Sequence, residues 1–267
     1  MTGGVAVNLD LTGRRVFVSG STRGIGYAVA AACAGEGASV VLNGRTEEKV
    51  SGAVARLRKA VPGASVDGIS ADMCDMEEVS ALLGRLGQVD ILVNNVGVFE
   101  VAPFFEITDE QWSRYFDINV MSAVRLSRAL LGGMIDRGWG RIIFTGTESA
   151  IDVPVDMVHY GATKATALAL GNGLAKLTRG TAVTVNTVLA GATYSDGVAE
   201  AVEGIASAQR VPPEDLTSSL VRSSSLIERF IEPEEVADLV TFLASPRSSA
   251  INGSAIRADG GVLPTII

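Results

Sequence analysis

Residues that bind metals or form disulfides are scarce in this chain. Its 267 residues include one histidine and two cysteines, Cys33 and Cys74, whose spacing matches neither a metal site nor a redox motif. This composition disfavours a histidine-based metal site, and we expect two reduced cysteines rather than a disulfide.

A net positive charge and long apolar runs are missing as well. The formal charge is −8, which gives no electrostatic footprint for nucleic acid or an anionic membrane surface. No run approaches the roughly 18 apolar residues of a membrane span, and Met1 to Asp10 lacks the basic and apolar regions of a signal peptide. We therefore expect a cytoplasmic protein with no nucleic-acid or membrane partner.

Short apolar runs alternate with longer helix-period segments along the chain. Strands are expected at residues 16–18, 39–42, 65–69, 90–93, 141–145 and 183–188. Helices are expected at residues 25–36, 47–60, 77–86, 109–137 and 157–179. Such alternation predicts an α/β fold with a doubly wound parallel sheet covered by helices on both faces. No linker divides the chain, so we expect one domain over residues 1–267.

Residues 192–230 interrupt this alternation of strand and helix segments. They are rich in Ser, Ala and Glu, contain Pro212-Pro213, and show weak periodicity. The segment is either a surface loop or a lid over a substrate. Because it follows a strand end, where ligands of such sheets bind, the lid is the favoured interpretation.

A glycine-rich turn follows the first expected strand. It runs from Ser19 to Gly26 with the spacing Gly-x-x-x-Gly-x-Gly. Glycines let the backbone approach a pyrophosphate closely, and the N-terminus of the following helix favours an anion. For this motif alone, a turn without a ligand would be an equally reasonable interpretation.

A tyrosine and a lysine lie four residues apart in the last long helix-period segment. Tyr160 and Lys164 share one helix face at this spacing. A phenol has a pKa near 10, and a neighbouring ammonium favours the phenolate, which moves the pKa toward neutrality. The pair is therefore a candidate for moving a proton to or from a carbonyl or alcohol oxygen.

These motifs occur with others in a fixed order. Asn94-Asn95-Val96-Gly97 follows the fourth strand, Asn119 lies in the long helix, and Asp259-Gly260-Gly261 lies near the end. From about Leu11 to Gly261, the sequence resembles the single-domain branch of the short-chain dehydrogenase/reductase family. The resemblance implies a Rossmann-like sheet of about seven strands and a homotetramer or dimer.

The resemblance also implies a catalytic set. It comprises Tyr160 as general acid/base, Lys164, Asn119 as the anchor of a water relay to Lys164, and a hydroxyl donor, usually Ser, thirteen residues before the tyrosine. That position is Thr147 here, and its hydroxyl can do the same task. Other departures from the family pattern are Val96, Ala190 and Ser195, none of which removes a required chemical group.

Residues at the end of the second strand contact the ribose 2′ position and so distinguish NAD(H) from NADP(H). Arg45 lies there with no carboxylate beside it, and Arg23 adds a second cation in the glycine turn. Arginine suits the 2′-phosphate of NADP(H), so we expect NADP(H) over NAD(H). Asp72 resembles the family's adenine-contacting residue, although a helix N-cap explains it equally well. The cofactor-binding residues implied are Gly20, Ser21, Thr22, Arg23, Gly24, Ile25, Gly26, Arg45, Asp72, Met73, Asn95, Gly97, Tyr160, Lys164, Gly191 and Ser195.

The reaction so implied is the interconversion of a ketone and a secondary alcohol on a small or medium organic molecule. A cofactor-binding regulator or scaffold without catalysis is the alternative. His159 should face away from the phenol and either pack or lie at the surface. Three acids, Glu148, Asp152 and Asp156, either line the substrate pocket or face water.

Overall fold

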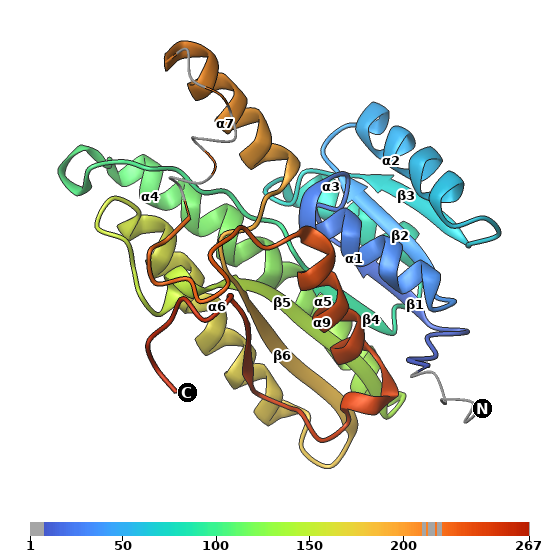
Figure 1. Ribbon diagram of the computed structural model, residues 1–267. Coiled ribbons are helices and arrows are strands. Elements are labelled where there is room, and N and C mark those ends of the chain that lie inside the picture. Colours follow the sequence, from blue (N-terminus) through green and yellow to red (C-terminus); the bar gives the residue numbers. More distant parts are fainter. Residues whose placement is uncertain (1–7, 210–211, 213–216, 218–220, 267) are drawn as a thin grey trace, which may run out of the picture.

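The computed structural model describes residues 8–209, 212, 217 and 221–266. Among them, seven parallel strands form one sheet in the order β3-β2-β1-β4-β5-β6-β7 (Figure 1). The strands are β1 (Arg15–Val18), β2 (Ser39–Gly44), β3 (Val66–Ser70), β4 (Ile91–Asn94), β5 (Trp139–Thr147), β6 (Ala182–Ala190) and β7 (Ala255–Ala258). The predicted doubly wound parallel sheet is confirmed. Its order reverses between β1 and β4, which is where such sheets bind ligands.

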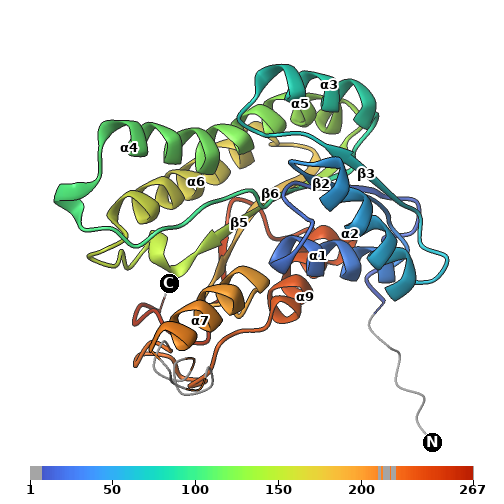
Figure 2. The ribbon, with the colours of Figure 1, turned by 90° about the horizontal axis from the view of Figure 1, so that it is seen from above.

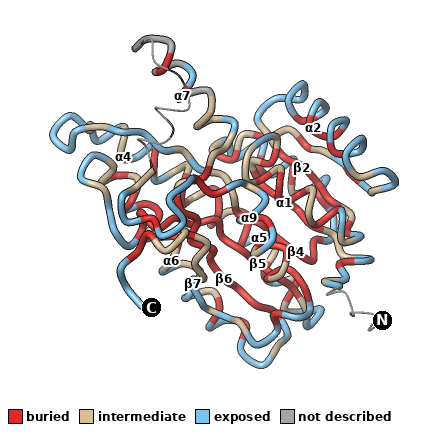
Figure 3. The backbone as a smooth tube through the Cα atoms, viewed as in Figure 1, coloured by how far each residue is buried: buried red, intermediate tan, exposed pale blue. Residues whose placement is uncertain are grey.

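Helices cover both faces of the sheet (Figure 2). One face carries α1 (Gly24–Gly35), α2 (Glu47–Ala60) and α9 (Pro233–Ala244), and the other carries α3 (Met76–Leu86), α5 (Ser122–Asp136) and α6 (Val158–Leu177). Each face has its own hydrophobic cluster, so the strands are buried on both sides (Figure 3). This explains why the strands read as continuous apolar runs in the sequence. Helix α9 and strand β7 were not assigned from the sequence.

The long helix expected at 109–137 is interrupted. Helix α4 (Asp109–Phe116) is followed by a π-helical turn, Asp117–Met121, before α5 begins. A π turn widens the helix locally, and such turns are often found at functional sites. Asn119 lies in this turn, and both its amide oxygen and its amide nitrogen bond the backbone of Val98. The expectation of one regular helix was wrong because a single π turn hardly disturbs the apolar pattern of the sequence.

The segment at 192–230 begins and ends against the sheet. The backbone N–H groups of Tyr194 and Ile231 bond the carbonyls of Ile231 and Ala192, at 2.8 and 2.9 Å. Between them, α7 (Asp196–Gln209) stands out from the rest of the fold at the top of Figure 1. Residues 210–211, 213–216 and 218–220 of this segment lie outside the described residues. Its function as a lid stays a prediction.

A buried arginine joins the end of α9 to the sheet. Arg141 is 1% exposed, and its guanidinium donates to the carbonyls of Ser245 (3.3 Å), Ala182 (2.8 Å) and Gly140 (2.9 Å). Burial lowers the pKa of Arg141 to about 10, with the nearby Arg14 cation as a smaller cause. The carbonyls therefore stabilise a cation that has lost its water.

Replacing this side chain should destabilise the fold. We expect Arg141→Met to lower the free energy of unfolding by about 2–4 kcal/mol, because buried carbonyls lose their donors. Urea denaturation followed by circular dichroism measures the change. Arg128→Met, at an exposed position of α5, is the matched control and should change stability by less than about 0.5 kcal/mol. Equal losses in the two variants would contradict the assignment.

Candidate active site

A pocket opens where β4, β5 and β6 end. It has a volume of about 360 Å³ and brings together side chains from the glycine turn, the strand ends, α6 and the segment after β6. Its lining includes Ile25, Asn95, Gly97, Thr147, Glu148, Ser149, Tyr160, Lys164, Gly191, Ser195 and Arg222. Seven of the sixteen residues expected to bind the cofactor are in this lining.

Two asparagine side chains form hydrogen bonds with the backbone of the glycine turn. Asn43 Oδ1 accepts from Gly20 N at 3.1 Å, and Asn95 Nδ2 donates to Gly20 O at 2.9 Å. Gly20 and Gly24 have φ of +60° and +56°, and a Cβ on Gly26 would lie 2.4 Å from Asn95 Nδ2. The turn therefore requires glycine at these positions. The supporting role of Asn43 was not predicted, because the sequence at this strand end was considered only for the absence of a carboxylate.

The N-terminus of α1 points out of this turn. Its N-cap, Arg23, makes no side-chain capping bond within the described chain. Gly24 N donates instead to Asp196 Oδ2, at the start of α7, at 3.1 Å. A carboxylate thus already binds the first amide of the helix, which is the position that favours an anion.

The other expected cofactor residues have diverse environments. Ser21 is buried, and its hydroxyl donates to Val18 O at 2.7 Å, so its side chain supports the turn. Thr22 packs against Gly44, where a Cβ would lie 2.5 Å from the threonine methyl. Arg45 is exposed at the end of β2.

Asp72 and Met73 follow β3. Asp72 Oδ1 accepts from Cys74 N at 2.9 Å, whereas Asp75 caps α3, so the N-cap alternative for Asp72 is wrong. The side chain of Met73 is buried in the core. Cys74 is a free thiol, as is Cys33.

Tyr160 and Lys164 both face the pocket from α6. Lys164 Nζ lies 6.0 Å from the centroid of the Tyr160 ring and donates to Thr145 O at 3.0 Å. Burial lowers the pKa of Lys164 to about 8. Burial also raises the pKa of Tyr160, outweighing a hydrogen bond from Thr147. The expected lowering of the tyrosine pKa is therefore wrong for the protein as it stands, since the desolvation of the phenolate dominates.

Thr147 ends β5 beside the phenol. It is 7% exposed, and its hydroxyl donates to Glu148 Oε2 at 2.6 Å while accepting from Ser149 N at 3.2 Å. The Ser149 hydroxyl donates to Glu148 Oε1 at 3.3 Å. The Thr147 hydroxyl lowers the pKa of Tyr160, although burial outweighs this effect. The choice of Thr147 over Ser149 as the hydroxyl donor stays a prediction.

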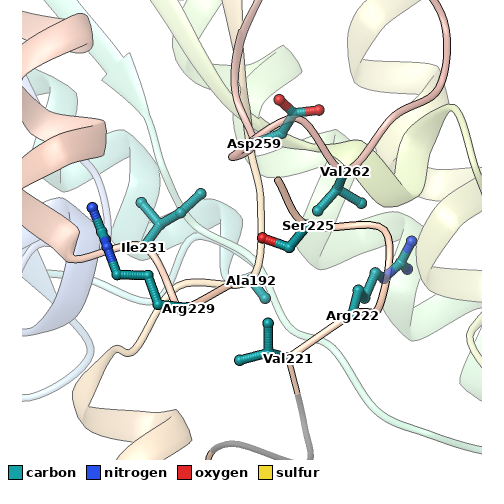
Figure 4. Close-up of a pocket in the computed structure, with 8 residues that line it drawn as sticks. All are labelled: Ala192, Val221, Arg222, Ser225, Arg229, Ile231, Asp259 and Val262. Atoms are coloured by element: carbon teal, nitrogen blue, oxygen red, sulfur yellow. The ribbon is translucent and has the colours of Figure 1, made fainter. Parts of the chain in front are cut away.

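Of the three acids expected either to line the pocket or to face water, one lies in the pocket and two lie at the surface. Glu148 is 4% exposed and lines the pocket, whereas Asp152 and Asp156 are exposed. Arg222 reaches Glu148 Oε1 at 3.8 Å and Asp152 Oδ2 at 3.5 Å. Figure 4 shows Arg222 on the wall of a small neighbouring cavity, with its guanidinium pointing away from that of Arg229. Arg222 was not predicted, because it lies in a segment without periodicity.

Asn119 and Gly97 complete the site around the lysine. Asn119 is buried, and its amide nitrogen donates to Thr163 Oγ1 at 3.0 Å as well as to Val98 O. A Cβ on Gly97 would lie 3.0 Å from Lys164 Nζ and 3.4 Å from Asn119 Oδ1. Asn119 thus fixes the loop that runs past the ammonium. The water relay remains a prediction.

His159 packs inside the protein. It is 1% exposed, and its ring centroid lies 4.1 Å from that of Tyr115 and 6.1 Å from that of Trp112. Burial lowers its pKa, and Glu100 opposes this weakly. The packing alternative is confirmed.

Comparison with known proteins identifies the family. The family described as Enoyl-(Acyl carrier protein) reductase matches residues 20–263. The uncharacterized oxidoreductase YvaG of Bacillus subtilis is 43% identical over 263 residues, covering 97% of this chain and 100% of that protein. The 3-oxoacyl-[acyl-carrier-protein] reductase of Vibrio cholerae is 31% identical, covering 95% and 99%. The L-sorbose reductase of Gluconobacter frateurii, solved with NADPH and L-sorbose, is 31% identical with a TM-score of 0.93, covering 97% and 100%.

The chain belongs to the short-chain dehydrogenase/reductase family and is an oxidoreductase. That family uses NAD(P). The site fits such a dinucleotide, because a turn with glycines at positive φ lies beside the pocket and the first amide of α1 there already binds a carboxylate oxygen. Gly97 leaves room beside the buried ammonium of Lys164. Separately, none of the helices in the described part of the chain has the length and apolar character needed to cross a membrane.

The buried imidazole should make stability depend on pH. Its pKa is lowered in the folded protein, so the unfolded chain binds the extra proton first. We expect wild-type stability to be full above pH about 6.5 and to fall as the pH drops below that value. His159→Phe, which keeps an aromatic contact with Tyr115, should lose less stability between pH 7.5 and 5.5 in urea titrations. Parallel losses in the two proteins would show that His159 does not contribute.

Proposed function

We propose that this oxidoreductase uses NADP(H) to interconvert a ketone and a secondary alcohol on a small or medium organic molecule. The observation that supports this most directly is the meeting of Tyr160, Thr147 and Lys164 in one pocket next to the glycine turn. A proton donor, a second hydroxyl and a buried cation are the groups that a carbonyl oxygen needs as it gains negative charge.

Each residue has a separate task in ketone reduction. NADPH, when bound, supplies the hydride. Tyr160 keeps its proton in the free protein because its pKa is raised, so it can donate that proton to the carbonyl oxygen. Thr147 donates a hydrogen bond to the same oxygen. Lys164, with a pKa of about 8, holds a positive charge near the developing phenolate.

Asn119 acts on the reacting atoms only through other residues. Its amide holds the loop at Val98 through two bonds, at 2.8 and 3.1 Å, and so keeps Gly97 against the lysine. We assign it as a positioning residue and retain the water relay to Lys164 as part of this proposal.

The choice of NADP(H) rests on two cations. Arg45 is exposed where β2 ends, and Arg23 occupies the N-cap position of the helix that follows the glycine turn. Guanidinium groups bind phosphate in a bidentate manner, and a carboxylate in their place would repel it. The L-sorbose reductase of similar structure, which was solved with NADPH, supports the same choice.

Removing the phenol hydroxyl tests the proposed mechanism. We expect Tyr160→Phe to lower kcat by about 10²- to 10⁴-fold, the usual contribution of a general acid. Thr147→Ser should retain most activity, and Thr147→Ala should lose most of it. NADPH consumption at 340 nm with a panel of ketones measures all three. Unchanged turnover by Tyr160→Phe would discard the mechanism, and NADPH binding without turnover by the wild type would favour the regulator or scaffold.

Reversing the charge at the end of β2 tests the cofactor. We expect Arg45→Asp to raise the KM for NADPH by about 10-fold or more and to leave the KM for NADH equal or lower, because a carboxylate repels the 2′-phosphate. Arg85→Asp, at an exposed position of α3, makes the same change in net charge and should leave the ratio of the two constants unchanged. A wild-type preference for NADH would refute the assignment.

A further inference from the structure

We infer that Glu148 selects the substrate, and that the substrate is a ketone with a hydroxyl group on the carbon next to the carbonyl. This inference rests on the proposed function and adds the chemical class on which the site acts. Glu148 follows Thr147 directly, is buried, and lines the same pocket as Tyr160.

The argument begins with the single proton of the Thr147 hydroxyl. A hydroxyl can donate one hydrogen bond, and Thr147 gives its bond to Glu148 Oε2 at 2.6 Å. Its oxygen is thereby left as an acceptor, for Ser149 N at 3.2 Å. In this arrangement Thr147 has no proton left for a carbonyl oxygen.

With a ketone that has no other polar group, Glu148 and the carbonyl oxygen compete for the single proton of Thr147. It brings only an acceptor, so either Thr147 stays bonded to the carboxylate, or it turns to the ketone and leaves Glu148 Oε2 without that donor. Losing a bond to a buried charged group is costly. A plain ketone is therefore activated by Tyr160 alone or at the expense of Glu148.

A hydroxyl group on the carbon next to the carbonyl removes this competition for the Thr147 proton. That hydroxyl donates to Glu148 Oε2 in place of Thr147, and the threonine proton is then free to bond the carbonyl oxygen. Glu148 Oε2 lies 2.6 Å from the threonine oxygen. A carbonyl oxygen that accepts the threonine proton would lie at a similar distance from that oxygen, so a hydroxyl on the adjacent carbon has the required reach. Every donor and acceptor around the carbonyl is then paired.

The charges around Glu148 select against acidic substrates. Arg222 lies 3.8 Å from Glu148 Oε1, and it also lies 3.5 Å from Asp152 Oδ2 and from the Ser149 hydroxyl. Its charge is thus shared between two carboxylates. A substrate carboxylate at this end of the pocket would meet Glu148 and Asp152 without a cation of its own, so a neutral hydroxyketone fits better.

Two ketones of equal size test the inference. Hydroxyacetone and butanone have the same number of non-hydrogen atoms and differ in a hydroxyl against a methyl group. With saturating NADPH, we expect the wild type to prefer hydroxyacetone by about 10- to 100-fold in kcat/KM, the worth of a hydrogen bond to a charged group. 2-Hydroxycyclohexanone and 2-methylcyclohexanone provide a second matched pair of larger size.

Removing the carboxylate should change the two activities in opposite ways. Glu148→Met should lose most activity toward hydroxyacetone, whereas activity toward butanone should hold or rise because the Thr147 proton is freed. Glu148→Gln, which keeps one acceptor of the same size, should give an intermediate ratio and covers the case in which the methionine variant does not fold. Asp152→Asn removes the other partner of Arg222 and should leave the ratio unchanged. Thermal unfolding and NADPH binding confirm that each variant is folded.

The outcomes separate this inference from the proposed function. A wild type that reduces both ketones equally, or a folded Glu148→Met that loses both activities in proportion, would overturn the role of Glu148 while leaving the reductase intact. A preference for acetoacetate over hydroxyacetone would overturn the argument from charge. A wild type that consumes NADPH with none of these ketones would refute both proposals.

Discussion

Burial of the sheet on both faces leaves the carboxyl ends of its strands as the place where polar side chains can meet a ligand. Within β1, β4 and most of β5 the side chains are apolar or small, and helices cover them from both sides. The polar groups that support the glycine turn or line the pocket come from strand ends, as Asn43 does on β2 and Thr147 on β5. Because parallel strands all end at one edge, these groups meet there, and the pocket is a consequence of the topology.

Burial also decides which protonation states the site holds before any ligand arrives. Desolvation favours the neutral forms of Tyr160 and Lys164: the pKa of the phenol rises and that of the amine falls to about 8. The amine still donates to Thr145 O at 3.0 Å. A phenol that keeps its proton can give it to a carbonyl oxygen, whereas the oxidation of an alcohol requires a group that takes a proton up.

The fold was predictable from the sequence because its signals are local. Runs such as those of β1 and β4 are apolar throughout, and each glycine or capping residue acts on its own turn. The residues of the catalytic set were found through spaced motifs in a fixed order. Their pKa values were not, because those depend on how much water the surrounding chain removes.

What the sequence did not reveal depends on contacts between distant segments. Asn43 supports Gly20 from another strand, and Arg222 reaches Glu148 from a segment without periodicity. Whether Glu148 faced water or the pocket was open for the same reason. A side chain's environment is set by the elements that pack around it, and no spacing along the chain encodes them.

The π turn at Asp117–Met121 has a consequence for how the helix can change. It adds a residue to one turn, so the side-chain rows of α4 and α5 are offset around the common axis. Upstream, α4 contacts α6 through Tyr115, while downstream α5 packs beneath the sheet through Leu126 and Met134. The side-chain rows of α4 and α5 are thus set separately, and we expect substitutions that turn α4 against α6 to leave the core contacts of α5 in place.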